Sequence, residues 1–231
     1  MSDRHDVIIA CDFSSAKECL DFLDRFDRER PWVKIGMELY YAEGPSVVRL
    51  LKDRGHSVFL DLKLHDIPNT VKKTMRVLSD LGADMVNLHA AGTKAMMEAA
   101  REGLGDSAIL LAVTMLTSTD QIRMEDEIMI HAPMEDVVLH YALLAAASGL
   151  DGVVCSPLEA GKVHACCGAS FLTVTPGVRF ADGEIGDQIR VTTPAGAKEL
   201  GSDFIVVGRP ITQATDPLQA WERCMKDFCG S

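Results

Sequence analysis

The chain has 231 residues, of which 47% are hydrophobic and 25% are charged, and its formal net charge is −11. This acidic balance disfavours non-specific binding to nucleic acid or to an anionic membrane, and no apolar run approaches the roughly 18 residues of a membrane span. Seven cysteines, an odd number, and an N-terminus without the layout of a signal peptide argue against a disulfide framework. We therefore expect a cytoplasmic protein that binds neither nucleic acid nor membrane.

Apolar runs of strand character alternate with helical segments along the chain. Strands are predicted over 7–12, 32–39, 57–64, 84–90, 108–117, 152–155, 171–175 and 204–207. Helices are predicted from Ser14, after Gly44-Pro45, and over 69–81, 93–103, 134–148 and 216–228, with a short segment at 158–165 and a surface turn or short helix at 120–127. This alternation implies parallel βαβ units, and about eight strands favour one α/β domain over 1–231, a closed (β/α)8 TIM barrel. An open doubly wound sheet is less favoured, because no Gly-x-Gly-x-x-Gly fingerprint follows the first strand.

Three ionisable side chains crowd the end of the third predicted strand. Asp61 and Lys63 are two residues apart, so they share one face of the strand at a backbone separation of roughly 6.6 Å, and Asp66 follows just past its end. A lysine between two aspartates stays protonated at neutral pH, which makes it a fixed cation and proton donor rather than a nucleophile. The alternative interpretation is a structural salt-bridge cluster.

Further polar residues fall where the other strands end. Asp12 ends the first predicted strand, Lys34 is expected to point into the barrel, Asn87 and His89 share one face of the fourth strand, and Thr117 ends the fifth. A TIM barrel carries its chemistry at the C-terminal ends of its strands. A single inward lysine or histidine can be a satisfied core group, but several at one barrel mouth indicate an active site.

The loops after the seventh and eighth strands each place glycine beside arginine, at 175–179 (Thr-Pro-Gly-Val-Arg) and 207–211 (Val-Gly-Arg-Pro-Ile). Barrels frequently bind phosphate at these two loops, where backbone N–H groups approach closely and arginine engages two oxygens. Two ordinary turns with solvated arginines are the alternative. The glycine-rich segment 180–191 is a candidate lid, although a mobile surface loop without function has the same composition.

With these motifs in view, the chain resembles the orotidine 5′-monophosphate decarboxylase family from end to end. The resemblance rests on Leu116-Thr117-Ser118, on the two glycine-arginine loops, and on the pattern Asp-x-Lys-x-x-Asp-Ile-x-x-Thr at Asp61, Lys63, Asp66, Ile67 and Thr70. Related sugar-phosphate barrels share the Asp-x-Lys-x-x-Asp core, so the ordered set of motifs is far more specific than the core alone.

The resemblance implies decarboxylation of orotidine 5′-monophosphate to UMP, the last step of de novo pyrimidine nucleotide synthesis, without metal or organic cofactor. It implies a charged catalytic network, with Lys63 as the proton donor, formed by Lys34, Asp61, Lys63 and Asp66. It implies a homodimer in which the partner's site receives Asp66, Ile67 and Thr70. It implies substrate contacts by Asp12 to the ribose, by Thr117 to the pyrimidine edge and by Arg179, Gln188, Gly208 and Arg209 to the phosphate. It also implies four further substrate-binding residues: Lys34, Ile67, Thr70 and Pro176.

Two other functions remain open from the sequence. A related sugar-phosphate barrel, such as a hexulose-phosphate synthase, would use the carboxylates to hold Mg²⁺ beside an enediolate. A catalytically silent barrel could serve as a nucleotide-binding or scaffolding module. The intact set of charged residues argues against the silent barrel, and sensitivity to a chelator distinguishes the two enzymes.

Overall fold

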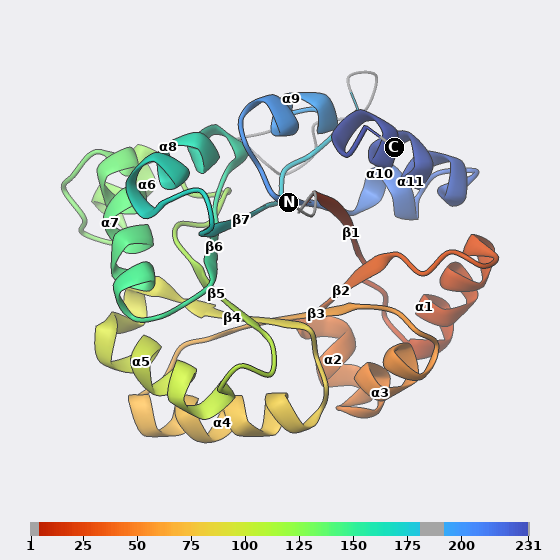
Figure 1. Ribbon diagram of the computed structural model, residues 1–231, viewed down its shortest axis with the longest axis horizontal. Helices are drawn as coiled ribbons and strands as arrows, with labels where there is room; N and C mark the ends of the chain where they lie inside the picture. The colour runs from red at the N-terminus through yellow and green to blue at the C-terminus, as the bar shows by residue number, and fades with distance from the viewer. Residues whose placement is uncertain (1–4, 181–191, 231) are drawn as a thin grey trace.

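Eight parallel strands close into a barrel, and the computed structural model describes them within residues 5–180 and 192–230. Each strand pairs with its sequence neighbours, and the eighth pairs with the first (Figure 1). The strands are β1 (Asp6–Ala10), β2 (Trp32–Gly36), β3 (Val58–Leu64), β4 (Met85–His89), β5 (Ile109–Val113), β6 (Gly152–Val154), β7 (Leu172–Thr175) and β8 (Phe204–Val207). The predicted (β/α)8 TIM barrel is confirmed.

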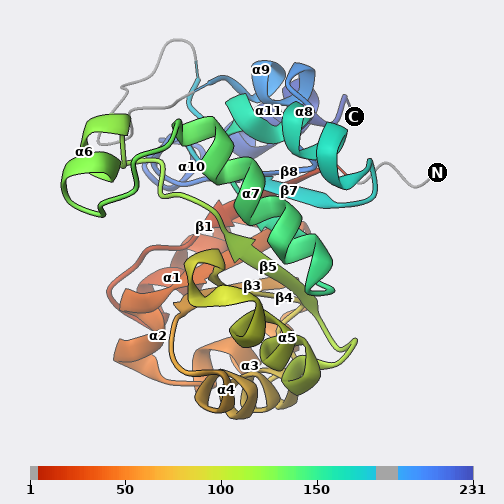
Figure 2. The same cartoon turned by 90° about the vertical axis from the view of Figure 1, so that its left-hand side faces the viewer.

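Helices surround the strands as an outer ring, and α6 stands out from this ring in the side view (Figures 1 and 2). They are α1 (Ala16–Leu23), α2 (Met37–Glu43), α3 (Ser46–Asp53), α4 (Pro68–Asp80), α5 (Thr93–Leu104), α6 (Gln121–Asp126), α7 (Met134–Ala147), α8 (Pro157–Cys167), α9 (Pro194–Glu199), α10 (Arg209–Thr212) and α11 (Pro217–Phe228), with 3₁₀ turns η1 (Asp24–Phe26) and η2 (Ala90–Gly92). None of the helices in the described ranges combines the length and apolar character needed to cross a membrane.

The apolar residues form two layers, because successive side chains of a strand point to opposite faces. Outward-facing residues such as Val33, Ile35 and Leu60 belong to the large core between the strands and the helices. Inward-facing residues such as Phe59 and Met85 belong to a smaller core that fills the barrel, as is usual in this fold. Polar residues that share the inward face with this inner core can therefore reach the barrel mouth.

Two strands, the second and the fifth, end three or more residues before their predicted ends. The second ends at Gly36, and Met37 begins α2 instead of continuing the alternation, with 46% of its surface exposed. The fifth ends at Val113, after which a Thr119 N–H to Leu116 carbonyl hydrogen bond of 2.9 Å closes a turn. Short apolar runs fit both a strand and the loop or helix after it, so strand ends are poorly predicted.

The helix α8 was predicted only as a short segment, and α9 was given no residue range. The segment at 158–165 is the core of α8, which starts at a capping box. The Glu159 carboxylate accepts the N–H of Ser156 at 2.9 Å, and the Ser156 hydroxyl accepts the N–H of Leu158 at 3.4 Å. Thr193 caps α9 by accepting a hydrogen bond from the N–H of Gly196 at 3.1 Å. Both caps can be recognised from the sequence, because Ser or Thr followed by proline is a typical helix start.

Candidate active site

A cavity of about 590 Å³ lies at the C-terminal ends of the strands. It gathers the following predicted site residues from β1, β2, β3, β5, β7 and β8 and the loops after them: Asp12, Lys34, Asp61, Lys63, Thr117, Pro176, Arg179, Gly208 and Arg209. This is the end of a TIM barrel at which active sites form. Asp12 and Thr117 lie beyond the last strand residues, Ala10 and Val113, rather than within the strands as predicted, yet both line the cavity.

Four charged side chains of the cavity alternate in sign. The Lys34 ammonium lies 3.0 Å from Oδ1 of Asp12 and 3.3 Å from Oδ2 of Asp61. The Lys63 ammonium lies 2.7 Å from Oδ1 of Asp61, so Asp61 is shared by both lysines. The prediction that Asp61 and Lys63 meet on one face, and the prediction that Lys34 points inward, agree with this geometry.

The ionisation of this network is set by a competition between burial and pairing. Burial opposes the charged form of Asp61, but Lys34 and Lys63 outweigh it and hold the pKa of Asp61 below its usual range. Burial likewise opposes the charge of Lys34, and Asp61 together with Asp12 outweighs it and raises the pKa of Lys34. Both groups are therefore charged at neutral pH, which keeps an ordered row of ion pairs beside the cavity.

Lys63 has an unusual backbone, with φ at +51°. A left-handed conformation costs a non-glycine residue about 1–2 kcal/mol, so the surroundings must hold it. The pairing of β3 with β4 is irregular here, since Leu60 pairs with Val86 but Leu64 pairs with Leu88. This bulge turns Lys63 back toward Asp61 at the rim of the cavity, a detail that the regular strand predicted from the sequence did not contain.

Asn87 on β4 is buried beneath this bulge, with 1% of its surface exposed. Its Oδ1 accepts a hydrogen bond from the backbone N–H of Lys63 at 2.8 Å, and its Nδ2 donates to Oδ1 of Asp61 at 2.7 Å. The sequence placed Asn87 on the inward face of the fourth strand but gave it no partner. His89, which lies on the same face of β4, has its ring centroid 5.7 Å from that of His65.

Gly36 explains how the Asp12 to Lys34 pair fits at the end of β2. A Cβ atom at this position would lie 3.0 Å from Oδ1 of Asp12 and 3.3 Å from the ammonium of Lys34. Contacts this short force a neighbour to move, so the missing side chain leaves the room that the ion pair occupies. A side chain at position 36 would require Asp12 or Lys34 to shift by a few tenths of an ångström.

The segment that follows β3 leaves the cavity rather than lining it. Asp66, Ile67 and Thr70 are all exposed, and Ile67 presents 67% of its surface. The Asp66 carboxylate accepts the N–H of Ile67 at 2.7 Å, and it has no ion-pair partner within residues 5–180 and 192–230. A single chain therefore does not bring Asp66 to Lys63.

The two glycine-arginine loops meet at one side of the cavity. Gly177 and Arg179 reach it from the loop after β7, and Gly208 and Arg209 from the loop after β8. The first loop is held by a Thr192 N–H to Gly177 carbonyl bond of 3.1 Å and an Arg179 N–H to Thr192 carbonyl bond of 2.9 Å. Gln188 and the candidate lid, apart from residue 180, lie outside the described residues.

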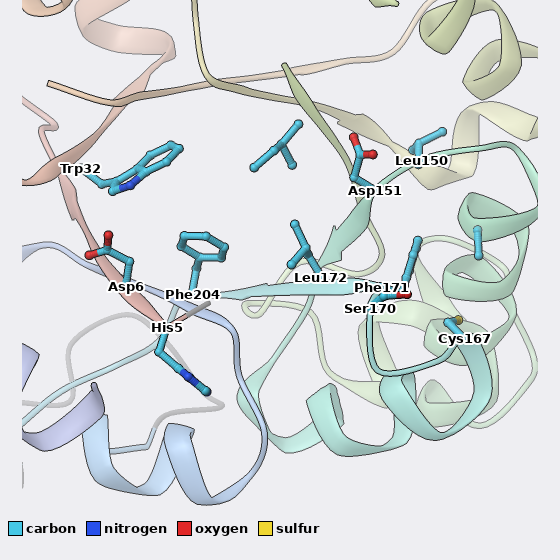
Figure 3. A pocket seen from close by; sticks show the side chains of 12 residues that line it. His5, Asp6, Trp32, Leu150, Asp151, Cys167, Ser170, Phe171, Leu172 and Phe204 are labelled. Carbon is cyan, nitrogen blue, oxygen red and sulfur yellow. The ribbon is translucent and has the colours of Figure 1, made fainter. Parts of the chain in front are cut away.

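A second cavity, of about 750 Å³, lies at the opposite end of the barrel (Figure 3). It is lined by the first residues of several strands, among them Asp6, Trp32, Leu172 and Phe204. Residues at this end of a TIM barrel generally serve stability, and none of the predicted site residues lines this cavity. The larger of these two cavities is therefore not the one that the predicted site residues line.

The donor groups of the site suit an organic anion. In the described part of the chain, no group of three or more His, Cys, Asp or Glu side chains is placed to hold a metal ion. All seven cysteines are free thiols. Lys34, Lys63, Arg179 and Arg209 all line the cavity, and such cations can bind an anionic ligand.

Comparisons with known proteins agree with this chemistry. The family model described as "Orotidine 5'-phosphate decarboxylase / HUMPS family" matches residues 5–224. The chain is 52% identical over 231 residues to the orotidine 5'-phosphate decarboxylase of Bacillus cytotoxicus, covering 97% of each chain, and 56% identical over 215 residues to that of Streptococcus thermophilus, covering 93% of each. A crystal structure of orotidine 5'-phosphate decarboxylase from Lactobacillus acidophilus superposes with a TM-score of 0.87 at 42% identity, covering 96% of this chain and 98% of that one.

Proposed function

The chain belongs to the orotidine 5′-phosphate decarboxylase / HUMPS family, and on that premise we propose that it decarboxylates orotidine 5′-monophosphate to UMP and CO₂. The observation that carries this proposal is the alternating row of Asp12, Lys34, Asp61 and Lys63 beside a cavity that Arg179 and Arg209 also line. The curated relatives of 52% and 56% identity, which bear the decarboxylase name, support it further.

The difficulty of this reaction is electrostatic. Breaking the bond from C6 to the carboxylate releases CO₂ and leaves an electron pair in the plane of the ring, out of conjugation with its π-system. We propose that the Lys63 ammonium stabilises this pair and then donates a proton to C6, which forms the C–H bond of UMP. Asp61 orients Lys63 through its 2.7 Å contact, and Lys34 helps to keep Asp61 ionised by lowering its pKa. Because the lysine replaces an electron sink, we expect the reaction to need no metal or organic cofactor.

The remaining cavity residues fit the other parts of the substrate. Asp12, which is exposed and paired with Lys34, is proposed to accept hydrogen bonds from the ribose hydroxyls. Thr117 is proposed to contact the pyrimidine edge. The phosphate is assigned to Pro176, Arg179, Gly208 and Arg209, together with Gln188.

The proposed working unit is a cytoplasmic homodimer of one barrel domain spanning 1–231. In it, the exposed Asp66, Ile67 and Thr70 reach the partner's site, so that Asp66 becomes the second carboxylate beside the partner's Lys63. Dimerisation would bury Ile67, whose side chain is exposed in the single chain. Seven free thiols are typical of proteins in a reducing compartment.

Identification of the product tests the proposed function and separates it from the metal-dependent alternative. We expect the purified protein to convert orotidine 5′-monophosphate to UMP and CO₂, at the same rate before and after treatment with a chelator. A hexulose-phosphate synthase would lose activity with its Mg²⁺ and would leave orotidylate intact. Failure to consume orotidylate, followed by absorbance, would contradict the proposal.

Arg209→Ala is expected to lower kcat as well as to raise KM. The phosphate lies far from C6, and the energy of binding it can orient the ring for reaction. Weaker phosphate binding is therefore expected to lower turnover. Losing a charge-assisted contact of about 1.5–3 kcal/mol corresponds to a fall of roughly 10- to 150-fold in kcat/KM. The matched control is Arg49→Ala, an exposed arginine of α3, and steady-state kinetics should leave it unchanged. A change confined to KM would assign Arg209 to binding alone.

A further inference from the structure

Asn87 replaces a backbone ladder bond at the bulge in β3. From Leu60 to Leu64 strand β3 advances by four residues, whereas its partner β4 advances by two, from Val86 to Leu88. The backbone N–H of Lys63 is therefore not aligned with a carbonyl of a regular ladder. The side-chain oxygen of Asn87 accepts that N–H at 2.8 Å. The bulge is thus closed by a side chain.

The same amide also fixes the carboxylate that pairs with Lys63. Its Nδ2 donates to Oδ1 of Asp61 at 2.7 Å, and this is the oxygen that lies 2.7 Å from the Lys63 ammonium. Asn87 therefore links the backbone of Lys63, through Asp61, to the end of its own side chain. Buried with 1% exposure, it does not line the cavity, so it acts on the ligand only through these two neighbours.

We propose that Asn87 is a positioning residue that holds Lys63 in its left-handed backbone conformation and Asp61 in place, so that the ammonium meets the reacting carbon. This inference rests on the proposed decarboxylation and adds a residue to it. The φ of +51° at Lys63 requires external support, and the Asn87 amide is the side chain bonded to that peptide group.

Asn87→Ala removes both hydrogen bonds and is expected to lower kcat by about 10²-fold, the effect of displacing a catalytic group by about 1 Å. Affinity for UMP should stay close to that of the wild type, because Asn87 is remote from the phosphate loops. Turnover is expressed per UMP-binding site, so that unfolded protein does not count. A kcat per binding site equal to that of the wild type would overturn the inference.

Asn87→Asp keeps an acceptor for the Lys63 N–H but places a second carboxylate against Asp61. The titratable groups around it are Asp61 and Lys63 on β3, Lys34 on β2, and His89 on β4, whose pKa is lowered by burial. Two adjacent carboxylates share a proton until the pH rises, so the acid limb of the kcat profile should move to higher pH. An unshifted profile with full turnover would count against the positioning role, and this isosteric variant serves as the test if Asn87→Ala does not fold.

The matched control is Thr173→Val, because Thr173 is also fully buried and its Oγ1 donates to Asp203 at 3.0 Å away from the cavity. It should lower Tm without changing kcat per binding site. A crystal structure of Asn87→Ala adds a readout independent of turnover: we expect a negative φ at Lys63 and a broken Lys63 to Asp61 contact. Unchanged geometry at Lys63 would refute the positioning role of Asn87 and leave the proposed function standing. A wild-type protein that does not consume orotidylate would refute the proposed function without testing the geometry at Lys63.

Discussion

Lys63→Ala is expected to lower kcat by about 10⁴-fold or more while the folded protein still binds UMP. Two contributions disappear together. An ammonium about 4 Å from a developing negative charge is worth about 4 kcal/mol at an effective dielectric constant near 20, taken as an upper bound. Proton donation to C6 is lost as well. The measurement is single-turnover consumption of orotidylate, with UMP affinity determined on the same preparation.

The fold should survive the loss of Lys63. Its side chain is at the rim of the cavity, with 26% exposed, and Asp61 keeps Lys34 at 3.3 Å and the Asn87 amide at 2.7 Å as partners. The control Lys17→Ala removes an ammonium whose side chain is 83% exposed on α1, and it should leave kcat unchanged. Near-normal turnover in Lys63→Ala would refute the role of this lysine.

Lys63→Arg separates electrostatic stabilisation from proton donation. Arginine keeps the positive charge but does not give up a proton in proteins, since its pKa exceeds about 12. We expect C6 charge stabilisation to survive in part and protonation to become the slow step, with a larger effect on turnover when the solvent is D₂O. Full activity in Lys63→Arg would show that Lys63 is not the proton donor.

The architecture was predictable because strand and helix patterns alternate along the chain, and their order fixes the topology of a parallel barrel. The charged residues were predictable for a related reason. Asp61 and Lys63 are two residues apart on one strand, and Lys34 lies between outward-facing Val33 and Ile35, so period-two alternation alone places all three on the inner face. The C-terminal ends of the strands then bring them to one mouth.

The features that the alternation of apolar residues did not predict depend on contacts between strands. The left-handed backbone of Lys63 arises from a register shift against β4, and a register shift has no signature in the sequence of β3 itself. The two hydrogen bonds of Asn87 follow from that shift. The end of β2 was mispredicted because Met37 continues the apolar alternation of Val33 and Ile35, although the strand ends at Gly36 and Met37 begins α2.

The position of Asp66 also depends on contacts that a single strand does not show, in this case contacts between chains. Its sequence neighbour Lys63 lines the cavity, whereas Asp66 lies on the exposed segment that leads into α4. A charged residue directed away from its own site can act in catalysis only if another chain presents a site to it. Mixing two inactive variants tests this without a structure of the dimer.

Mixing Lys63→Ala subunits with Asp66→Ala subunits is expected to restore activity that neither variant has alone. If Asp66 acts across a two-fold interface, each heterodimer contains one site with both defects and one site with neither. Random exchange of equal amounts makes half of the dimers mixed, so about one quarter of wild-type activity should return. Activity is measured after partial denaturation and refolding of the mixture.

The control for this experiment is a mixture of Lys63→Ala with Asp61→Ala. These two residues belong to the same site of the same chain, 2.7 Å apart, so every site in the mixed dimers keeps one defect and no activity should return. If activity returns in the first mixture and not in the control mixture, Asp66 acts in the partner's site. Failure of both mixtures, with exchange verified by a tag on one subunit, would contradict the shared site and leave Asp66 as a surface residue of the segment after β3.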